Sequence, residues 1–273
     1  MSILKKCFPR LTKKDEQGIA MMVACGVVLA VIVGTYLWIS SHQEKLDGNF
    51  CLLGAAAEKH IAVIVDKSEK WDNESIVGLK SFLQGIYQSI HLHERLTVMV
   101  ITDVDGGTGK TVEARTLFNM CAPRSEGECN WAMMNCRRIA QKYRESFAAP
   151  LAQLSDTLAK PDEASYSPLL KTVAQTINDN RSPVLDIYFI SDLMENGYKF
   201  RFDDRVPLAS KVVAEYPINT NNAKVAVHAL FVDRVRYDKV LKDGVQAVWR
   251  DYLNRQGVAF NLEHSVFVDK TVE

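Results

Sequence analysis

The most constraining stretch of this sequence is an unbroken apolar run, Ile61 to Val65, that leads directly into Asp66. A run this short and this rich in β-branched residues is typical of a strand buried on both faces of a parallel sheet. In open α/β sheets, ligand sites lie just past the carboxyl ends of such strands. Asp66 and Ser68 are two residues apart, so in an extended segment their side chains would point the same way. We therefore expect a polar site at this strand end.

The rest of the chain alternates between strand and helix patterns. Two further apolar runs, 184–190 and 224–232, are typical of strands, and an acid, Asp192, closely follows the first of them. Apolar residues at three- and four-residue steps predict amphipathic helices at 76–90 and 241–253. This alternation predicts an α/β fold: a mostly parallel, doubly wound sheet with helices on both faces and one antiparallel strand.

A glycine-rich stretch, 102–111, ends in Gly109-Lys110-Thr111 and so invites comparison with a phosphate-binding loop. That motif requires a glycine five residues before Gly109, where this chain has Val104, and a helix directly after the Lys-Thr pair. The residues that follow, 112–118, have an extended pattern instead. We therefore predict a hairpin turn between two strands, and this hairpin supplies the antiparallel strand.

The segment 18–39 carries no charge, and its length suits a helix that spans a bilayer, which takes about 20 residues. The flank before it is basic and the flank after it is not, so the positive-inside rule places the N-terminus in the cytoplasm. We predict a cytoplasmic basic tail at 1–18, a single transmembrane helix at 19–40 in the inner (cytoplasmic) membrane, a linker at 41–58, and a periplasmic or otherwise extracytoplasmic domain at 59–273.

The sequence leaves three alternatives to this topology. A cleaved signal peptide would have a shorter apolar core, about 7–15 residues, with a small-residue site close behind it, and Ala55-Ala56-Ala57 lies too far downstream. A lipoprotein signal at 22–25 would place Cys25 at the end of the apolar run, yet the run continues past it. The reversed topology would leave the domain in the cytoplasm with its thiols free.

Residues at about 119–165 are predicted to form a helical insertion, with one helix at 131–147 and another at 151–158, separated by Pro150. On an oxidising side of the membrane, four cysteines permit two bridges with three connectivities. The insertion has the weakest apolar pattern of the chain, so a bridge there would stabilise what packing does not. A zinc site has no close Cys-x-x-Cys pair or nearby histidine to support it. We expect at least one disulfide, with Cys121 bonded to Cys129 or Cys136; the candidates are Cys51, Cys121, Cys129 and Cys136.

Three loops of the sequence together resemble those of the von Willebrand factor A (vWA) domain. The first is Asp66-Lys67-Ser68-Glu69-Lys70, which follows an apolar strand where that family has Asp-x-Ser-x-Ser. The second, Ser167-Pro168-Leu169, lies at a helix start, where the family has a Thr just before a Pro-Leu pair. The third, Ile190-Ser191-Asp192, follows a later strand and supplies the family's aspartate. The resemblance covers roughly residues 58–270 and implies the same α/β fold.

In that family the three loops hold Mg²⁺ or Mn²⁺, and an acidic group from a partner protein completes the coordination, as suits hard cations. By resemblance, the surviving ligands would be Asp66, Ser68, Ser167 and Asp192. Lys70 stands where the third hydroxyl belongs, and its ammonium group would neutralise an acid of the site and displace the metal. We therefore expect a degenerate site without a bound cofactor, with Mg²⁺ or Mn²⁺ as the alternative. In the simpler interpretation, Asp66 and Asp192 only accept backbone hydrogen bonds and pair with Lys70.

Composition and resemblance together limit the function. Basic and acidic residues balance at 33 each, so the chain has no nucleic-acid footprint. We predict a membrane-anchored, non-enzymatic module that binds protein partners through the loops at the carboxyl ends of the strands, within an envelope or transfer-apparatus complex. The alternative is a divalent-metal-dependent hydrolase that uses Asp66 and Asp192, with an acid from 200–205 as its general base.

Overall fold

The computed structural model describes residues 13–41, 44–67, 71–105, 110–129, 135–159, 167–202, 205–232 and 238–264. The chain divides into two compact units, Met1–Glu44 with Cys129–Asn135, and Lys45–Glu128 with Cys136–Glu273. The first unit contains helix α2 (Lys13–Ser41). Within its segment Gln17–Ser41, an 18-residue window has a mean hydropathy of 2.4 and no buried residues, so by length and composition the helix can cross a membrane. The predicted long apolar helix near the N-terminus is therefore present.

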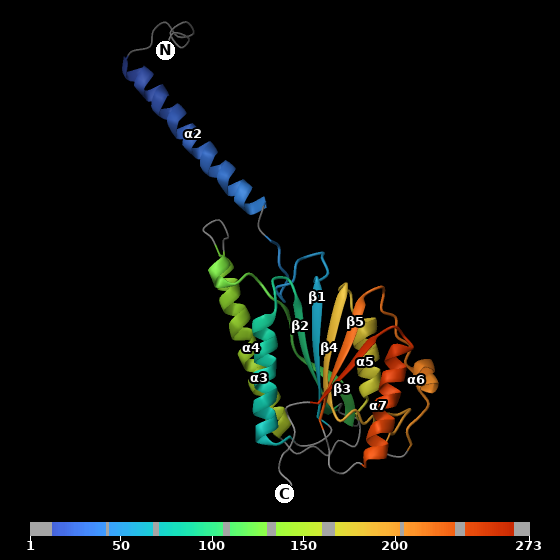
Figure 1. Cartoon of the computed structure of the whole chain (residues 1–273). Coiled ribbons are helices and arrows are strands. Elements are labelled where there is room, and N and C mark those ends of the chain that lie inside the picture. The colour runs from blue at the N-terminus through green and yellow to red at the C-terminus, as the bar shows by residue number, and fades with distance from the viewer. Residues whose placement is uncertain are drawn as a thin grey trace. The chain divides into compact units, whose positions relative to one another are not determined.

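The second unit is built on a six-stranded sheet in the order β3-β2-β1-β4-β5-β6 (Figure 1). Every neighbouring pair is parallel except β2 with β3. The predicted doubly wound sheet with one antiparallel strand is confirmed. The strands are β1 (Lys59–Asp66), β2 (Arg95–Asp105), β3 (Lys110–Cys121), β4 (Val184–Ser191), β5 (Lys224–Phe231) and β6 (Ala259–His264).

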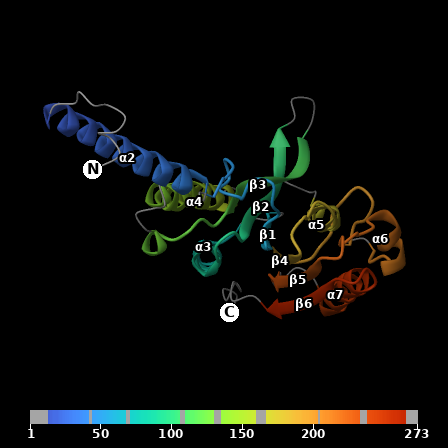
Figure 2. The same ribbon diagram turned by 90° about the horizontal axis from the view of Figure 1, so that it is seen from above.

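Helices cover both faces of the sheet, and the side chains of β1 show how. Ile61, Val63 and Val65 pack on one face with α3 (Asn73–Ser89) and α4 (Cys136–Ala159). Ala62 and Ile64 alternate to the other face, where the core includes α5 (Leu169–Asn178), α6 (Ala209–Glu215) and α7 (Lys239–Asn254). Figure 2 shows these two helical layers on opposite sides of the sheet. The apolar run 61–65 is thus buried on both faces, as predicted.

The glycine-rich stretch joins two paired strands. Asp105 at the end of β2 faces Lys110 at the start of β3 in the antiparallel ladder. Residues 106–109 lie outside the described residues. Because Lys110 and Thr111 begin a strand rather than a helix, the phosphate-loop interpretation is excluded on structural grounds as well.

The predicted insertion differs from the structure at two points. Residues 119–121 extend β3, and a single helix, α4, runs through Pro150 where two helices were predicted. An internal proline costs a helix about 3 kcal/mol because it removes a hydrogen bond and crowds the preceding turn. Tyr143 and Phe147 before it and Leu154 and Leu158 after it are all buried in the same core cluster, and this packing keeps the helix continuous. Residues 131–134, predicted to begin the first helix, lie outside the described range.

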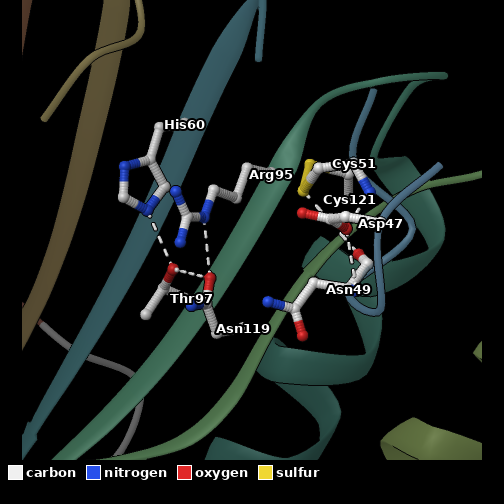
Figure 3. The surroundings of a disulfide bond; sticks show 8 residues. All are labelled: Asp47, Asn49, Cys51, His60, Arg95, Thr97, Asn119 and Cys121. Carbon is white, nitrogen blue, oxygen red and sulfur yellow. Dashed lines mark hydrogen bonds between the residues drawn. A yellow bond between two sulfur atoms is a disulfide. The ribbon is translucent and has the colours of Figure 1, made fainter. Parts of the chain in front are cut away.

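The predicted pairing of Cys121 with Cys129 or Cys136 is wrong. Cys121 is bonded to Cys51, 70 residues earlier in the chain (Figure 3). The backbone explains this choice, because the Cys121 amide donates to the carbonyl of Asn49 at 2.9 Å and so holds the 47–51 turn against the end of β3. Cys129 and Cys136 are also disulfide-bonded, so all four candidate cysteines are oxidised.

Candidate functional site

The strand order places one crevice of the sheet between β1 and β4. From β1 the chain continues to β2 on one side, whereas β4 lies on the other side, so the direction of winding reverses here. At such a reversal the loops that follow the two strands separate and leave room for a ligand or partner. Asp66 ends β1 and Ser191 ends β4, so both loops begin with a polar side chain.

Asp66 is the centre of a buried polar cluster at this crevice. Ser167 donates its hydroxyl hydrogen bond to Oδ1 of Asp66, and Ser191 donates to Oδ2, each at 2.9 Å. The three residues are 3%, 1% and 2% exposed, respectively. Both carboxylate oxygens therefore have protein donors, which offsets the desolvation of this buried acid.

The second loop is held in place by backbone pairing. Ser167 and Asn196 exchange two hydrogen bonds between their amides and carbonyls, at 2.8 and 3.1 Å, and so form an isolated antiparallel bridge. Helix α5 starts immediately afterwards at Leu169, as the Ser167-Pro168-Leu169 pattern predicts. The bridge brings the second and third loops together although they are about 30 residues apart in the sequence.

The third loop is tightly wound after β4. Ser191 Oγ accepts a hydrogen bond from the Leu193 amide, and Asp192 Oδ1 accepts one from the Met194 amide, each at 2.9 Å. Leu193 has a φ of 63°, a left-handed conformation that is costly for a residue with a branched side chain. The indole of Trp249 donates to the Leu193 carbonyl at 2.9 Å and helps to hold this turn. Strain of this kind persists only where the surrounding contacts enforce it.

Glu195, also in the third loop, is a buried acid beside this cluster. Its Oε2 accepts a hydrogen bond from the amide of Leu170 at 2.8 Å, at the start of α5, where Pro168 offers no side-chain cap. Burial, with a smaller contribution from the nearby Asp66 charge, raises the pKa of Glu195 to about 8, against the opposing effect of the Leu170 amide. Among the described residues, its other oxygen, Oε1, has no hydrogen-bond partner. A Cβ at position 197 would lie 2.2 Å from Oε1, so a larger residue there would force the Glu195 carboxyl group to move.

The structure brings together two of the predicted site residues, Asp66 and Ser167, by a direct hydrogen bond. Asp192 begins the adjoining loop and is 5% exposed. Ser68 and Lys70 lie outside the described residues. Sequence reasoning did not select Ser191, although it directly precedes Asp192 in the third loop. It also missed Glu195, whose only sequence signal is an acid three residues beyond Asp192.

The cluster offers only oxygen atoms as metal ligands: the carboxylate of Asp66 and the hydroxyls of Ser167 and Ser191. Ligands of this type fit Mg²⁺ or Mn²⁺. They are fewer than the six ligands that Mg²⁺ takes, so water or a partner's acid would have to supply the others. Within the part of the chain that the structure describes, no three His, Cys, Asp or Glu side chains are grouped as a metal site.

The three loops of the resemblance meet at one edge of a doubly wound sheet, in the order and at the strand ends that it implies. The chain has a vWA-like fold. No protein-family model and no curated protein match it. The part of the chain with this fold is the second unit, Lys45–Glu128 with Cys136–Glu273.

Three solved structures are similar to the chain. They are the ArnB paralog VWA2 from Sulfolobus acidocaldarius (11% identity, TM-score 0.43, covering 78% of this chain and 43% of that one), proximal thread matrix protein 1 from the mussel byssus (10%, 0.37, 77% and 42%), and a mutant of the PilB minor pilin from Streptococcus sanguinis (8%, 0.41, 81% and 59%). The chain thus spans less than two thirds of each of these proteins. At this level of sequence identity, the likenesses concern the fold alone.

Proposed function

We propose that this chain is a membrane-anchored interaction module whose vWA-like domain binds a protein partner through the loops that follow β1 and β4. The observation that carries the proposal is the Asp66–Ser167–Ser191 cluster, which ties three loops into one platform. Rigid platforms reduce the entropy that binding costs, because the loops are ordered before the partner arrives.

Exposed apolar side chains beside this platform support the proposal. Tyr198, in the β4–α6 loop, is 91% exposed, and Leu208, just before α6, is 69% exposed. An aromatic side chain that is exposed on a fixed loop is a common anchor of protein interfaces. The loop carrying Tyr198 is fixed at its base by the bridges from Asn196 to Ser167 and Arg201.

The cellular setting is part of the same proposal. An apolar helix precedes the domain, and the cysteines that follow it are disulfide-bonded, which is typical of proteins outside the cytoplasm. Together with the basic residues before the helix, these features support a cytoplasmic N-terminus and a domain on the far side of the membrane. A component of an envelope or transfer-apparatus complex would have this arrangement.

The proposal is tested by site-specific photocrosslinking in native membranes. A crosslinking amino acid at position 198 or 208 should give one discrete protein adduct, and the same probe at Val240, which is 81% exposed on α7, should not. An Asp66→Ala change should abolish the adduct at 198, because the loops lose their common anchor. Equal labelling from 198 and 240, or no adduct from any loop position, would contradict the proposal.

The metal question is tested separately at Lys70. If its ammonium group replaces the ion, millimolar Mg²⁺ should leave the melting midpoint of the parent chain unmoved. Lys70→Ser should then create metal dependence, because it restores a hydroxyl ligand and removes a competing charge. Metal binding at a hundredfold excess over Kd adds about 2.7 kcal/mol of stability. A parent chain whose midpoint rises with Mg²⁺ and falls again with chelator would show that Lys70 does not exclude the metal.

A further inference from the structure

A cavity of about 380 Å³ lies at the opposite end of the sheet from the Asp66 cluster. Its walls come from three separate parts of the fold: the 47–57 loop, the ends of β2 and β3 at Arg95 and Cys121, and the α5–β4 turn at Arg181 and Ser182. The volume lies within the range of small-molecule sites, about 300–1,000 Å³. We propose that this cavity binds a small anionic ligand, a carboxylate or phosphate that carries a short apolar chain. This proposal is independent of the proposed function.

Two guanidinium groups supply the charge that an anion needs. Arg95 donates its Nε hydrogen bond to the side-chain oxygen of Asn119 at 2.7 Å. Arg181 makes only long hydrogen bonds, 3.4 and 3.5 Å, to the carbonyls of Asn180 and Asn178. Within the described ranges, neither guanidinium is ion-paired with a carboxylate. A guanidinium presents several fixed N–H donors and binds carboxylate or phosphate oxygens in pairs.

The acid that lines the cavity is already engaged. Asp47 accepts hydrogen bonds through Oδ1 from the amides of Asn49 and Cys51, at 2.8 and 2.9 Å, and so shapes the loop that forms one wall. Its charge offsets part of the field of the two arginines, which leaves a net charge of one positive unit among the lining side chains. A ligand with one negative group matches that charge.

A continuous hydrogen-bond network joins the walls that carry the two arginines. His60 Nε2 contacts Thr97 Oγ1 at 2.9 Å and His60 Nδ1 contacts Asn180 Oδ1 at 3.2 Å. Thr97 Oγ1 also lies 3.1 Å from the side-chain oxygen of Asn119, which holds Arg95, and Asn180 donates to the carbonyl of Ser182 beside Arg181. Figure 3 shows the part of this network around Arg95. Burial lowers the pKa of His60 to about 4, so at neutral pH its ring adds no charge of its own.

The part of the 47–57 wall that follows Asp47 and Asn49 is apolar and is fixed by the Cys51–Cys121 disulfide. It presents Leu52, Leu53 and the alanines 55–57, side chains that would contact an alkyl group but not a bare ion. The disulfide and the Asn49–Cys121 backbone bond hold this loop against β3 (Figure 3). The cavity therefore combines cationic donors on one side with a preformed apolar surface on the other, as expected for an anion with an apolar chain.

The test is calorimetric titration of the full chain in zwitterionic nanodiscs with hexanoate, hexyl phosphate and inorganic phosphate. At least one of the two six-carbon probes, hexanoate or hexyl phosphate, should bind saturably at a single site, and more tightly than inorganic phosphate. Arg181→Gln should weaken that binding at least tenfold, because a charge-assisted hydrogen bond is lost. Arg250→Gln, an exposed arginine on α7, is the matched control and should leave the affinity unchanged.

A second variant guards against a change that acts only through folding. Ala56→Glu leaves both arginines in place but adds a carboxylate to the apolar wall, and it should abolish binding without changing the melting midpoint. The proposal is overturned if no probe binds saturably, if Arg181→Gln and Arg250→Gln have the same effect, or if inorganic phosphate binds as tightly as the hexyl anions. The last outcome would mean that the cavity attracts any anion and has no ligand selectivity.

Discussion

The two ends of strand β1 stabilise their buried polar groups in different ways. At its carboxyl end, Asp66 is a buried acid held by two serine hydroxyls from separate loops, with a second buried acid, Glu195, beside it. At its amino end, His60 is a buried neutral base within a network that reaches two arginines. Hydrogen bonds tie the first end together, and a disulfide also holds the second. The comparison predicts that redox conditions affect one end and rising pH affects the other.

Removing the disulfide should have the largest effect. Cys51→Ser opens a loop closed across 70 residues, and the chain-entropy estimate for that closure is about 4 kcal/mol at 25 °C. The loss should appear in urea unfolding followed by the fluorescence of buried Trp71 and Trp249. The hexanoate or hexyl phosphate affinity of the amino-end cavity should fall, whereas crosslinking from position 198 should persist. Equal loss at both ends would show that they are not separable.

Removing the acid of the other end should be the next largest effect. Asp66→Ala leaves two buried hydroxyls without their acceptor, and each such orphaned group costs about 1–3 kcal/mol. We expect about 3 kcal/mol of destabilisation in the same urea assay, with ligand binding at the amino-end cavity retained. Ser155→Ala, on α4, removes a hydroxyl whose hydrogen bond stays within its own helix and serves as the control. A loss no larger than that of the control would mean that the cluster contributes little.

Rising pH should act through Glu195. Its folded pKa is raised, so between its ordinary value near 4.5 and about 8 the folded chain retains a proton that the unfolded chain has lost. Its contribution is therefore fully present below pH 4.5 and falls with rising pH, by up to about 1.4 kcal/mol per pH unit. Glu195→Gln keeps an acceptor for the Leu170 amide but does not titrate, so its stability should fall less steeply. Parallel profiles for parent and variant from pH 5 to 8 would exclude this role.

Acidic pH should act through His60, with a smaller effect. Its folded pKa is lowered to about 4 from 6.5, so in this window the unfolded chain binds a proton that the folded chain excludes. The neutral ring's contribution is thus present above pH 6.5 and is lost as the pH falls, about 1 kcal/mol by pH 5.5. His60→Gln should reduce this acid sensitivity when the melting midpoint is followed from pH 7 to 5. His91, which is exposed, offers a control substitution.

Sequence patterns predicted the parts of the fold that local chemistry determines. The runs that became β1, β4 and β5 are continuous and apolar, and Ser167-Pro168-Leu169 marks the start of α5. Strand β6 was missed because Ala259–His264 alternates polar with apolar residues and lies at the sheet edge. The short apolar stretch 266–268 also predicts an edge strand, and it lies outside the described residues.

The site contacts were harder to predict because they join distant parts of the chain. Asp66 could be selected from its position after a strand, but its two serine partners are 101 and 125 residues away. The choice of Cys51 over Cys129 depends on a turn whose backbone pairs with β3, a contact with no local signature. Glu195 has an altered pKa only because the third loop folds over it, and no pattern in the sequence encodes that burial.

The Cys51–Cys121 bond has a mechanical consequence if the chain is held at one end in a membrane, as we propose. Tension that enters through residues before Cys51 passes across the sulfur bridge to the end of β3 as well as along the backbone toward β1. Strand β1, which lies inside the bridged loop, is then shielded from being peeled out of the centre of the sheet. Pulling on the oxidised chain should extend it by a shorter length than pulling on the reduced chain, because the residues between the two cysteines stay folded or looped. The pulling force would then act on the edge strand β3, and the central strand β1, which carries Asp66, would bear less of it.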